Sequence, residues 1–153
     1  MLPNSTNPPI SCTCSSLRKL TRTVTRLYDQ HLADAGLKTT QYSLLKNIDL
    51  EPLPIAELAE RLSMERTTMT RNLKPLIDAG WVELKAGSDS RQRIPTITKA
   101  GRDRIKLAKQ AWKRAQIELQ QTMGEQAVRD LHAHLDTALS RLTPLIEEHA
   151  HAK

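Results

Sequence analysis

The side chains with the clearest chemistry lie in the segment Ser63–Gly80, which predicts one helix with two different faces. Four hydroxyl or cationic side chains gather on one face at about 100° per residue, with no carboxylate among them: Thr67, Thr68, Arg71 and Lys74. In a DNA major groove, arginine pairs with guanine, and threonine bonds bases or touches thymine methyl groups. This face therefore predicts base recognition, although a solvated amphipathic helix has the same pattern.

The opposite face of this helix is apolar and predicts packing on a small core through Met69, Leu73, Leu76 and Ile77. Gly80 is expected to end the helix, and Pro75 is expected to kink it. Upstream, Ile55–Leu62 predicts a short helix that Pro54 opens at its first position, and Ser63–Met64 predicts a turn. This order indicates a helix-turn-helix, whose second helix enters the major groove.

After Gly80 the pattern changes to the alternation of β-strands. Trp81–Lys85 and Arg93–Ile97 predict a hairpin, and Pro95 restricts it to the edge of a sheet. A hairpin directly after a recognition helix is a wing. Arg91 at its polar tip suits a narrow minor groove, where the negative potential attracts arginine. Asp89 is placed to orient the Arg91 guanidinium group, although both are also ordinary turn residues.

The N-terminal segment Ser15–Ala35 predicts a helix with a narrow apolar seam of Leu17, Leu20, Val24 and Leu27, with Leu32 further on. Ser15 or Ser16 is expected to cap it, and Gly36 is expected to end it. The seam predicts packing against another helix, either in a dimer or within the same domain.

A second helix is predicted at Leu37–Ile48, with Thr39 or Thr40 as its cap. Its inward residues are expected to be Tyr42, Leu45 and Ile48. The two prolines of Glu51–Pro54 then break the helical pattern.

The C-terminal third predicts two long helices. Thr98 is expected to cap the first, Lys99–Thr122, and Gly124 separates it from the second, which Pro144 is expected to kink. The apolar residues of the two helices are Ile105, Ala108, Trp112, Ala115 and Leu119, then Val128, Leu131, Leu135, Leu139, Leu142 and Ile146. Because this exceeds what a winged helix needs, these helices predict a dimer platform.

Charge and composition favour a DNA-binding protein over other classes. Residues 61–106 contain 11 Lys and Arg against 5 Asp and Glu, so this segment carries the whole net charge of +6. Aromatic residues make up only 3%, which argues against a stacking platform for single strands. The sequence shows neither a catalytic set of residues nor a phosphate-binding glycine loop, so we do not expect an enzyme. We also expect no cofactor. The absence of a membrane span or signal peptide, and the use of only two cysteines, predict a cytoplasmic protein.

These residues resemble those of the multiple-antibiotic-resistance regulator (MarR) family. The most specific match is Asp89-x-Arg91, five residues, then Ile97-Thr98-x-x-Gly101, which is similar to the family's wing signature D-x-R, five residues, L-T-x-x-G. Arg66–Leu73 resembles the family's recognition helix, while Lys38 and Pro95 depart from its usual pattern. The resemblance implies a homodimer that binds a pseudo-palindromic operator on double-stranded DNA.

The predicted organisation follows from the motifs and the resemblance together. We expect an N-terminal arm at 1–14, helical dimerisation regions at 15–36 and 99–150, and a winged helix-turn-helix at 37–98, in a mainly α fold with a small β-wing. The expected DNA contacts are Arg66, Thr67, Thr68, Thr70, Arg71, Lys74, Asp89, Arg91 and Arg93. The expected function is a transcriptional regulator, in the form of a repressor that a small-molecule effector releases from DNA.

Two sites are candidates for the signal. Relatives of this kind often bind aromatic carboxylates, for which Arg18 or Arg22 is a possible partner. The alternative is oxidant sensing by Cys12 and Cys14, because a helix N-terminus and nearby cations stabilise the reactive thiolate. A direct bond between these two thiols is expected to be strained, and small buried residues are the simpler interpretation.

A metal site is not expected. His132 and His134 lie about 200° apart on a helix, so their side chains point in different directions. His149 and His151 belong to a tail whose spacing requires no ion.

Overall fold

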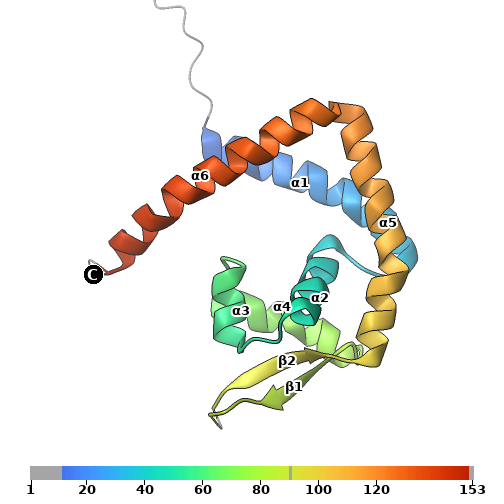
Figure 1. Cartoon of the computed structure of the whole chain (residues 1–153), viewed down its shortest axis with the longest axis vertical. Helices are drawn as coiled ribbons and strands as arrows, with labels where there is room; N and C mark the ends of the chain where they lie inside the picture. Colours follow the sequence, from blue (N-terminus) through green and yellow to red (C-terminus); the bar gives the residue numbers. More distant parts are fainter. Residues whose placement is uncertain (1–11, 90, 152–153) are drawn as a thin grey trace, which may run out of the picture. The chain divides into compact units, whose positions relative to one another are not determined.

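The computed structural model describes residues 12–89 and 91–151, with side chains to residue 148. The elements in chain order are α1 (Thr13–Leu32), the 3-10 helix η1 (Ala33–Ala35), α2 (Thr39–Leu50), α3 (Ile55–Arg61), α4 (Arg66–Asp78), β1 (Val82–Ala86), β2 (Arg93–Ile97), α5 (Lys99–Met123) and α6 (Glu125–His151) (Figure 1). This confirms the predicted class, a mainly helical protein with a small β-hairpin. Most of the expected N-terminal arm lies outside the described residues, and its last two residues are helical.

The chain forms two compact units, Met1–Trp112 and Lys113–Lys153, and α5 runs from one into the other. The first unit extends past the hairpin because the start of α5 carries apolar side chains that complete its core. These core residues are Ile105, Ala108 and Ala111.

Helix α1 begins earlier than expected. It starts at Thr13 with Cys12 in the N-cap position, so the prediction that Ser15 or Ser16 caps it is wrong. Cys12 makes no side-chain capping bond, and the first turn closes by the Ser16 N–H donating to the Cys12 carbonyl at 3.0 Å. At the other end α1 tightens into η1, and the helical segment ends at Gly36 as predicted, with a left-handed φ of +65°.

Helix α2 is tied to α1 through Asp29. The backbone N–H and the hydroxyl of Thr39 both donate to Oδ1 of Asp29, each at 2.7 Å. The N-cap position belongs to Lys38, so the predicted cap at Thr39 or Thr40 is wrong by at least one residue. The Lys38 N–H donates instead to Oε1 of Gln41 at 2.9 Å. The carboxylate of Asp29, ten residues earlier in the chain, therefore bonds the N–H of Thr39 at this helix start, where a local cap was expected.

Helices α3 and α4 form the predicted helix-turn-helix. Pro54 is the N-cap of α3, one position before the place expected for it. The turn contains Ser63 at a φ of +50°, which ends α3 and delays the start of α4 to Arg66. Helix α4 then continues through the exposed Pro75 to Asp78.

The core of the first unit lies where α2, α3, α4, the hairpin and the start of α5 meet. It contains the residues predicted to face inward on the second helix and on the recognition helix, namely Tyr42, Leu45, Ile48, Met69, Leu73 and Leu76. Ile55, Leu62 and Ile77 are only partly buried at its margin. Burial raises the pKa of Tyr42, and also that of Tyr28 in α1.

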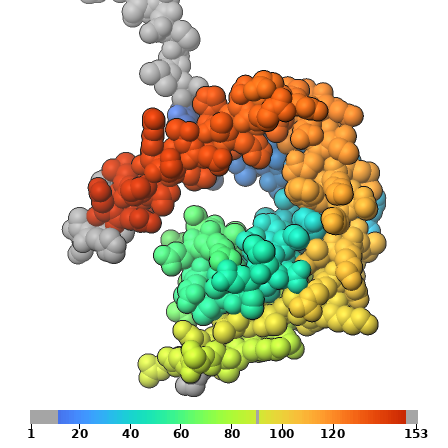
Figure 2. Space-filling model, viewed as in Figure 1, coloured from blue at the N-terminus to red at the C-terminus, as the bar shows by residue number. Residues whose placement is uncertain are grey.

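Strands β1 and β2 pair antiparallel, with Val82 opposite Ile97 and Leu84 opposite Pro95. Both strands of a two-stranded sheet are edges, so the predicted edge position of Pro95 is confirmed. The hairpin forms a ridge beside α2 and α3 of the same unit (Figure 2).

Thr98 and Gly101 join the base of the hairpin to α5. The Thr98 hydroxyl contacts the carbonyl oxygens of Gly80 at 2.7 Å and of Trp81 at 3.1 Å. It also accepts the Gly101 N–H at 3.1 Å, which confirms Thr98 as the predicted cap. A Cβ atom on Gly101 would lie 2.2 Å from the Trp81 carbonyl oxygen, so the close approach requires glycine.

Arg104 holds a second connection around the same tryptophan. Its Nη1 donates to the carbonyl of Ala35 at 2.9 Å, and its guanidinium carbon lies 4.9 Å from the centroid of the Trp81 ring. One side chain of α5 thus contacts both the end of η1 and the residue that precedes β1.

Candidate nucleic-acid interface

The exposed face of α4 carries most of the side chains predicted to meet DNA. Thr67 and Arg71 are exposed, and Thr68 is half-buried beside them. The same helix buries Met69 and Leu73 in the core. The apolar face therefore holds α4 in a fixed orientation on the core. The opposite face presents hydroxyl groups and a cation to solvent.

Two predicted contacts on α4 already have partners within the helix. The Thr70 hydroxyl donates to the Arg66 carbonyl at 3.0 Å, which leaves it able only to accept a further hydrogen bond. Lys74 pairs with Asp78 one turn later at 2.7 Å, so a carboxylate lies beside the face that was expected to have none. The side chain of Lys74 is 75% exposed, and such a surface pair contributes about 0.3–0.5 kcal/mol, so phosphate can replace it.

The wing places two exposed arginines, Arg91 at its tip and Arg93 at the start of β2. The carboxylate of Asp89 was expected to orient the Arg91 guanidinium group. Instead its Oδ1 accepts the backbone N–H of Arg91 at 3.0 Å, and its carbonyl accepts the Gln92 N–H at 2.9 Å. Asp89 therefore shapes the turn that presents Arg91, since its carboxylate bonds the backbone of Arg91 and not the guanidinium group.

Sequence reasoning missed a small pocket beside the recognition helix. It has a volume of about 210 Å³ and lies between the start of α2 and the middle of α4. Its lining residues are Lys38, Thr40, Gln41, Arg71, Asn72 and Pro75. Lys38 was noted in the sequence only as a departure from a family pattern, and nothing local indicated that it lies near Arg71.

The candidate signal residues lie on α1. Cys12 and Cys14 are exposed free thiols at its start, which makes the interpretation as small buried residues wrong. Arg18 and Arg22 are exposed one to three turns further along the helix. These four side chains share the N-terminal half of one helix.

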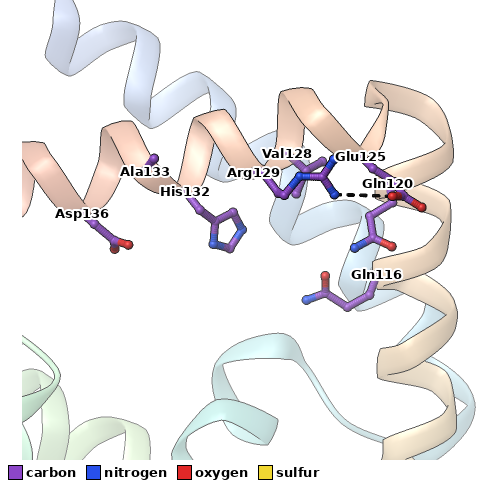
Figure 3. A pocket seen from close by; sticks show the side chains of 8 residues that line it. All are labelled: Gln116, Gln120, Glu125, Val128, Arg129, His132, Ala133 and Asp136. Carbon is purple, nitrogen blue, oxygen red and sulfur yellow. Dashed lines mark hydrogen bonds and ion pairs between the residues drawn. The ribbon is translucent and has the colours of Figure 1, made fainter.

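The second unit has a polar cleft of about 480 Å³ between the end of α5 and the start of α6. Gln116 and His132 point into it from the two helices, and Arg129 pairs with Glu125 at 3.4 Å (Figure 3). His134 instead has its ring nitrogen Nδ1 at 2.6 Å from the Asp130 carbonyl, so the two histidines have separate surroundings. Among the described residues, no three His, Cys, Asp or Glu side chains are grouped to hold a metal.

The described residues include helices as long as α5 and α6. None of them is both long enough and apolar enough to cross a membrane.

Comparison with known proteins gives consistent matches. A model described as the MarR family matches residues 35–92. The Mycobacterium tuberculosis transcriptional regulator MosR, solved in complex with DNA, is 34% identical with a TM-score of 0.74, covering 86% of this chain and 98% of that chain. Apo MarR from Escherichia coli, at 22% identity and a TM-score of 0.69, covers 85% of this chain and 98% of that chain and shares the fold.

A curated relative matches a shorter region. The HTH-type transcriptional regulator YwoH of Bacillus subtilis (strain 168) is 30% identical over 79 residues, which is 51% of this chain. The match spans 58% of that relative, little more than half its length.

Proposed function

This chain belongs to the MarR family of transcriptional regulators, and on that premise we propose that it is a homodimeric repressor that binds a pseudo-palindromic DNA operator. A small molecule, such as an aromatic acid, releases it from the operator. The family membership makes it a regulator and not an enzyme. The MosR relative was solved with DNA, which supports DNA as the partner of this chain.

The observation that carries the proposal is the pairing of α4 with the wing. Helix α4 exposes Thr67 and Arg71 directly before a hairpin whose tip exposes Arg91. A helix with these groups can bond base edges in a major groove, while an arginine on the wing suits the adjacent minor groove. The surrounding segment, 61–106, carries the whole excess of positive charge.

The homodimer is supported by an apolar seam on α6. Leu135, Leu139, Leu142 and Ile146 recur at intervals of four, three and four residues, so they lie on one face of the helix. Their exposed fractions include 62% for Leu139 and 65% for Ile146. A seam of this spacing buries itself against another helix, and a second copy of the chain supplies one in a symmetric dimer.

The charge of the effector is proposed from the cations on α1. Arg18 and Arg22 are exposed on α1, and a carboxylate bound beside that helix can pair with either guanidinium group. A carboxylate therefore suits this chain as the charged group of the effector, while its aromatic part is proposed from the family resemblance.

Selection of bound sequences from random duplexes tests the proposal directly. We expect a palindrome with half-site centres about one helical turn, or a multiple of it, apart. The Arg71→Ala variant should lose discrimination at one base position of each half-site, at a cost of about 1–3 kcal/mol. Lys109→Ala, which removes an exposed cation from α5, is the control that should keep the wild-type motif. Failure of the wild-type protein to enrich any motif would refute the proposal.

A second candidate function is regulation by oxidants through Cys12 and Cys14. It is favoured by the exposure of both free thiols at the start of α1, where an oxidant in solution can reach them. Stepwise oxidation, or a disulfide to the partner protomer, would alter this helix end.

Repeating the selection after peroxide treatment separates the two candidates. Loss of the motif in the wild type, with its retention in Cys12→Ser or Cys14→Ser, would support the redox function. An unchanged motif after peroxide would contradict it and leave the small-molecule effector as the signal.

A further inference from the structure

The small pocket between α2 and α4 has a lining that suits an anion. Its six lining residues are Lys38, Thr40, Gln41, Arg71, Asn72 and Pro75, and none of them carries a carboxylate. Lys38 and Arg71 approach from different helices. Neither has an ion-pair partner in the part of the chain that the structure describes. Two positive charges therefore share a concave surface without a compensating negative charge.

Hydrogen bonds hold the uncharged side of this pocket in place. Oε1 of Gln41 accepts the Lys38 backbone N–H at 2.9 Å, so the amide oxygen is occupied and the amide NH₂ remains available to donate. Asp29, the nearby carboxylate, is occupied by the N–H and hydroxyl of Thr39. The first two N–H groups at this helix end are thus already bonded, and the pocket depends on side chains and not on the helix terminus.

We propose that this pocket binds a phosphate of the DNA backbone, with Lys38, Thr40 and Gln41 as contacts outside the helix-turn-helix. The inference rests on the proposed function, because it needs the exposed face of α4 to lie in a major groove. A helix in the major groove has a sugar-phosphate backbone along each side. Arg71 lies on the exposed face of α4 and also lines the pocket, so the pocket is on the flank of the helix where a backbone runs.

Under this assignment, one group of residues contributes affinity for any duplex and another contributes sequence preference. Phosphate contacts set the position of a protein on the duplex, and base contacts set its preference for a sequence. Lys38 and Gln41 should therefore contribute to binding of every duplex. Arg71 should contribute to the preference among duplexes and, through the pocket, to their common affinity.

Three single variants test the assignment. Lys38→Ala removes the cation. Gln41→Glu keeps an oxygen to accept the Lys38 N–H but adds a negative charge to the pocket. Lys46→Ala removes an exposed cation from the same helix α2 at a position that does not line the pocket. Thermal unfolding followed by circular dichroism establishes that each variant folds.

The measurement is the dissociation constant for the selected operator and for a random duplex, at several salt concentrations. For Lys38→Ala we expect equal weakening on both duplexes, about tenfold near 0.1 M salt, and a salt slope smaller by about 0.9 per protomer. Gln41→Glu should weaken both duplexes at least as much. Lys46→Ala should retain the wild-type constants and slope.

Each other outcome overturns the assignment. Wild-type slopes in both pocket variants would mean that no phosphate binds there. Weakening on the operator alone would mean that these residues contact bases. If inorganic phosphate, titrated without DNA, binds in a Lys38-dependent way while DNA affinity is unchanged, the pocket serves a free anion instead. Failure of the proposed function would look different, since the wild-type protein itself would then show no preferred duplex.

Discussion

At the scale of single residues, Gly101 lies where the start of α5 passes close to the base of the hairpin. A glycine-to-alanine change inside a helix ordinarily stabilises a protein by about 0.5–1 kcal/mol. Here the added Cβ would meet the Trp81 carbonyl oxygen at 2.2 Å. We therefore expect Gly101→Ala to lower the free energy of unfolding by about 1–3 kcal/mol, measured by urea denaturation.

The neighbouring residue provides the control for this prediction. Ala100 is exposed in the same turn, so Ala100→Gly should cost only the helix-propensity difference of about 1 kcal/mol. A stabilising effect of Gly101→Ala would show that α5 and the strand base are further apart than described.

The two tyrosines make a second residue-scale prediction, on stability at alkaline pH. Burial raises the pKa of Tyr28 and Tyr42 above 10, so the folded state holds these protons more tightly than the unfolded state. Their contribution is complete below pH 10 and declines as the pH rises above it. The midpoint of urea unfolding should fall less between pH 9 and 11 in the Tyr28→Phe/Tyr42→Phe double variant, which has no tyrosine. Identical declines would contradict the prediction.

Sequence reasoning at this scale identified the right residues more often than the right contacts. Thr98 and Gly101 could be recognised because their spacing belongs to a motif, and Thr98 is the cap expected of it. The reason for the glycine, a carbonyl oxygen 20 residues earlier, depends on the folded chain. Asp29 bonding Thr39 is similar, because no local pattern links residues on separate helices.

At the scale of elements, the helices were predicted well in their faces and less well in their ends. The buried side of α4, with Met69, Leu73 and Leu76, follows directly from the helical period. The segment predicted for it begins at Ser63, three positions before Arg66, although Ser63–Met64 was also predicted as the turn. The left-handed conformation of Ser63 was not predicted, because it is rare for serine and the residue type does not indicate it. The hairpin was within one residue of its true ends because the alternation and Pro95 both constrain it.

The wing gives a prediction at this scale, because the proposed function requires β1 and β2 to carry Arg91 to the DNA. Arg91→Ala should weaken binding about tenfold, or ~1.4 kcal/mol, when the sequence beside the half-site has a narrow minor groove. The loss should be smaller next to G·C-rich sequence. Fluorescence anisotropy with two operators that differ only in these flanks measures both effects.

Lys85→Ala is the matched control for the wing. It removes an exposed cation of β1 whose charge is already paired with Glu83 at 3.1 Å. Equal affinities of Arg91→Ala and wild type on the operator with narrow-groove flanks would remove Arg91 from the interface.

At the scale of the whole molecule, the apolar seam on α6 predicts assembly. Replacing Leu139 and Leu142 by glutamate would place charges on a face that the proposed dimer buries. Sedimentation velocity should show a dimer for wild type and a monomer for Leu139→Glu/Leu142→Glu. Operator affinity should fall with it, because one half-site alone would be bound.

Thr137→Glu is the control for assembly, since it adds a charge to the opposite side of the same helix. It should remain dimeric. A dimer that survives the double leucine substitution would mean that another surface joins the protomers.

The concentration of positive charge in residues 61–106 could be found from the sequence, because counting charged residues does not depend on the folded structure. The 11 cationic residues of 61–106 belong to the end of α3, α4, the hairpin and the start of α5. The pocket that pairs Lys38 with Arg71 could not be found in this way, since Lys38 lies outside that segment. Its detection depends on how α2 and α4 pack, which is a property of the core.

Helix α5 is one continuous helix shared by the two units. It is a single helix from Lys99, next to the Thr98 anchor of the hairpin, to Met123 in the second unit. At 1.5 Å per residue, a helix of 25 residues is roughly 37 Å long, and a tilt of about 10° at one end displaces the other by roughly 6 Å. A displacement of that size exceeds the tolerance of a hydrogen bond to DNA. Under the proposed function, a signal bound far from α4 and the wing would need only to turn this helix slightly to release the DNA.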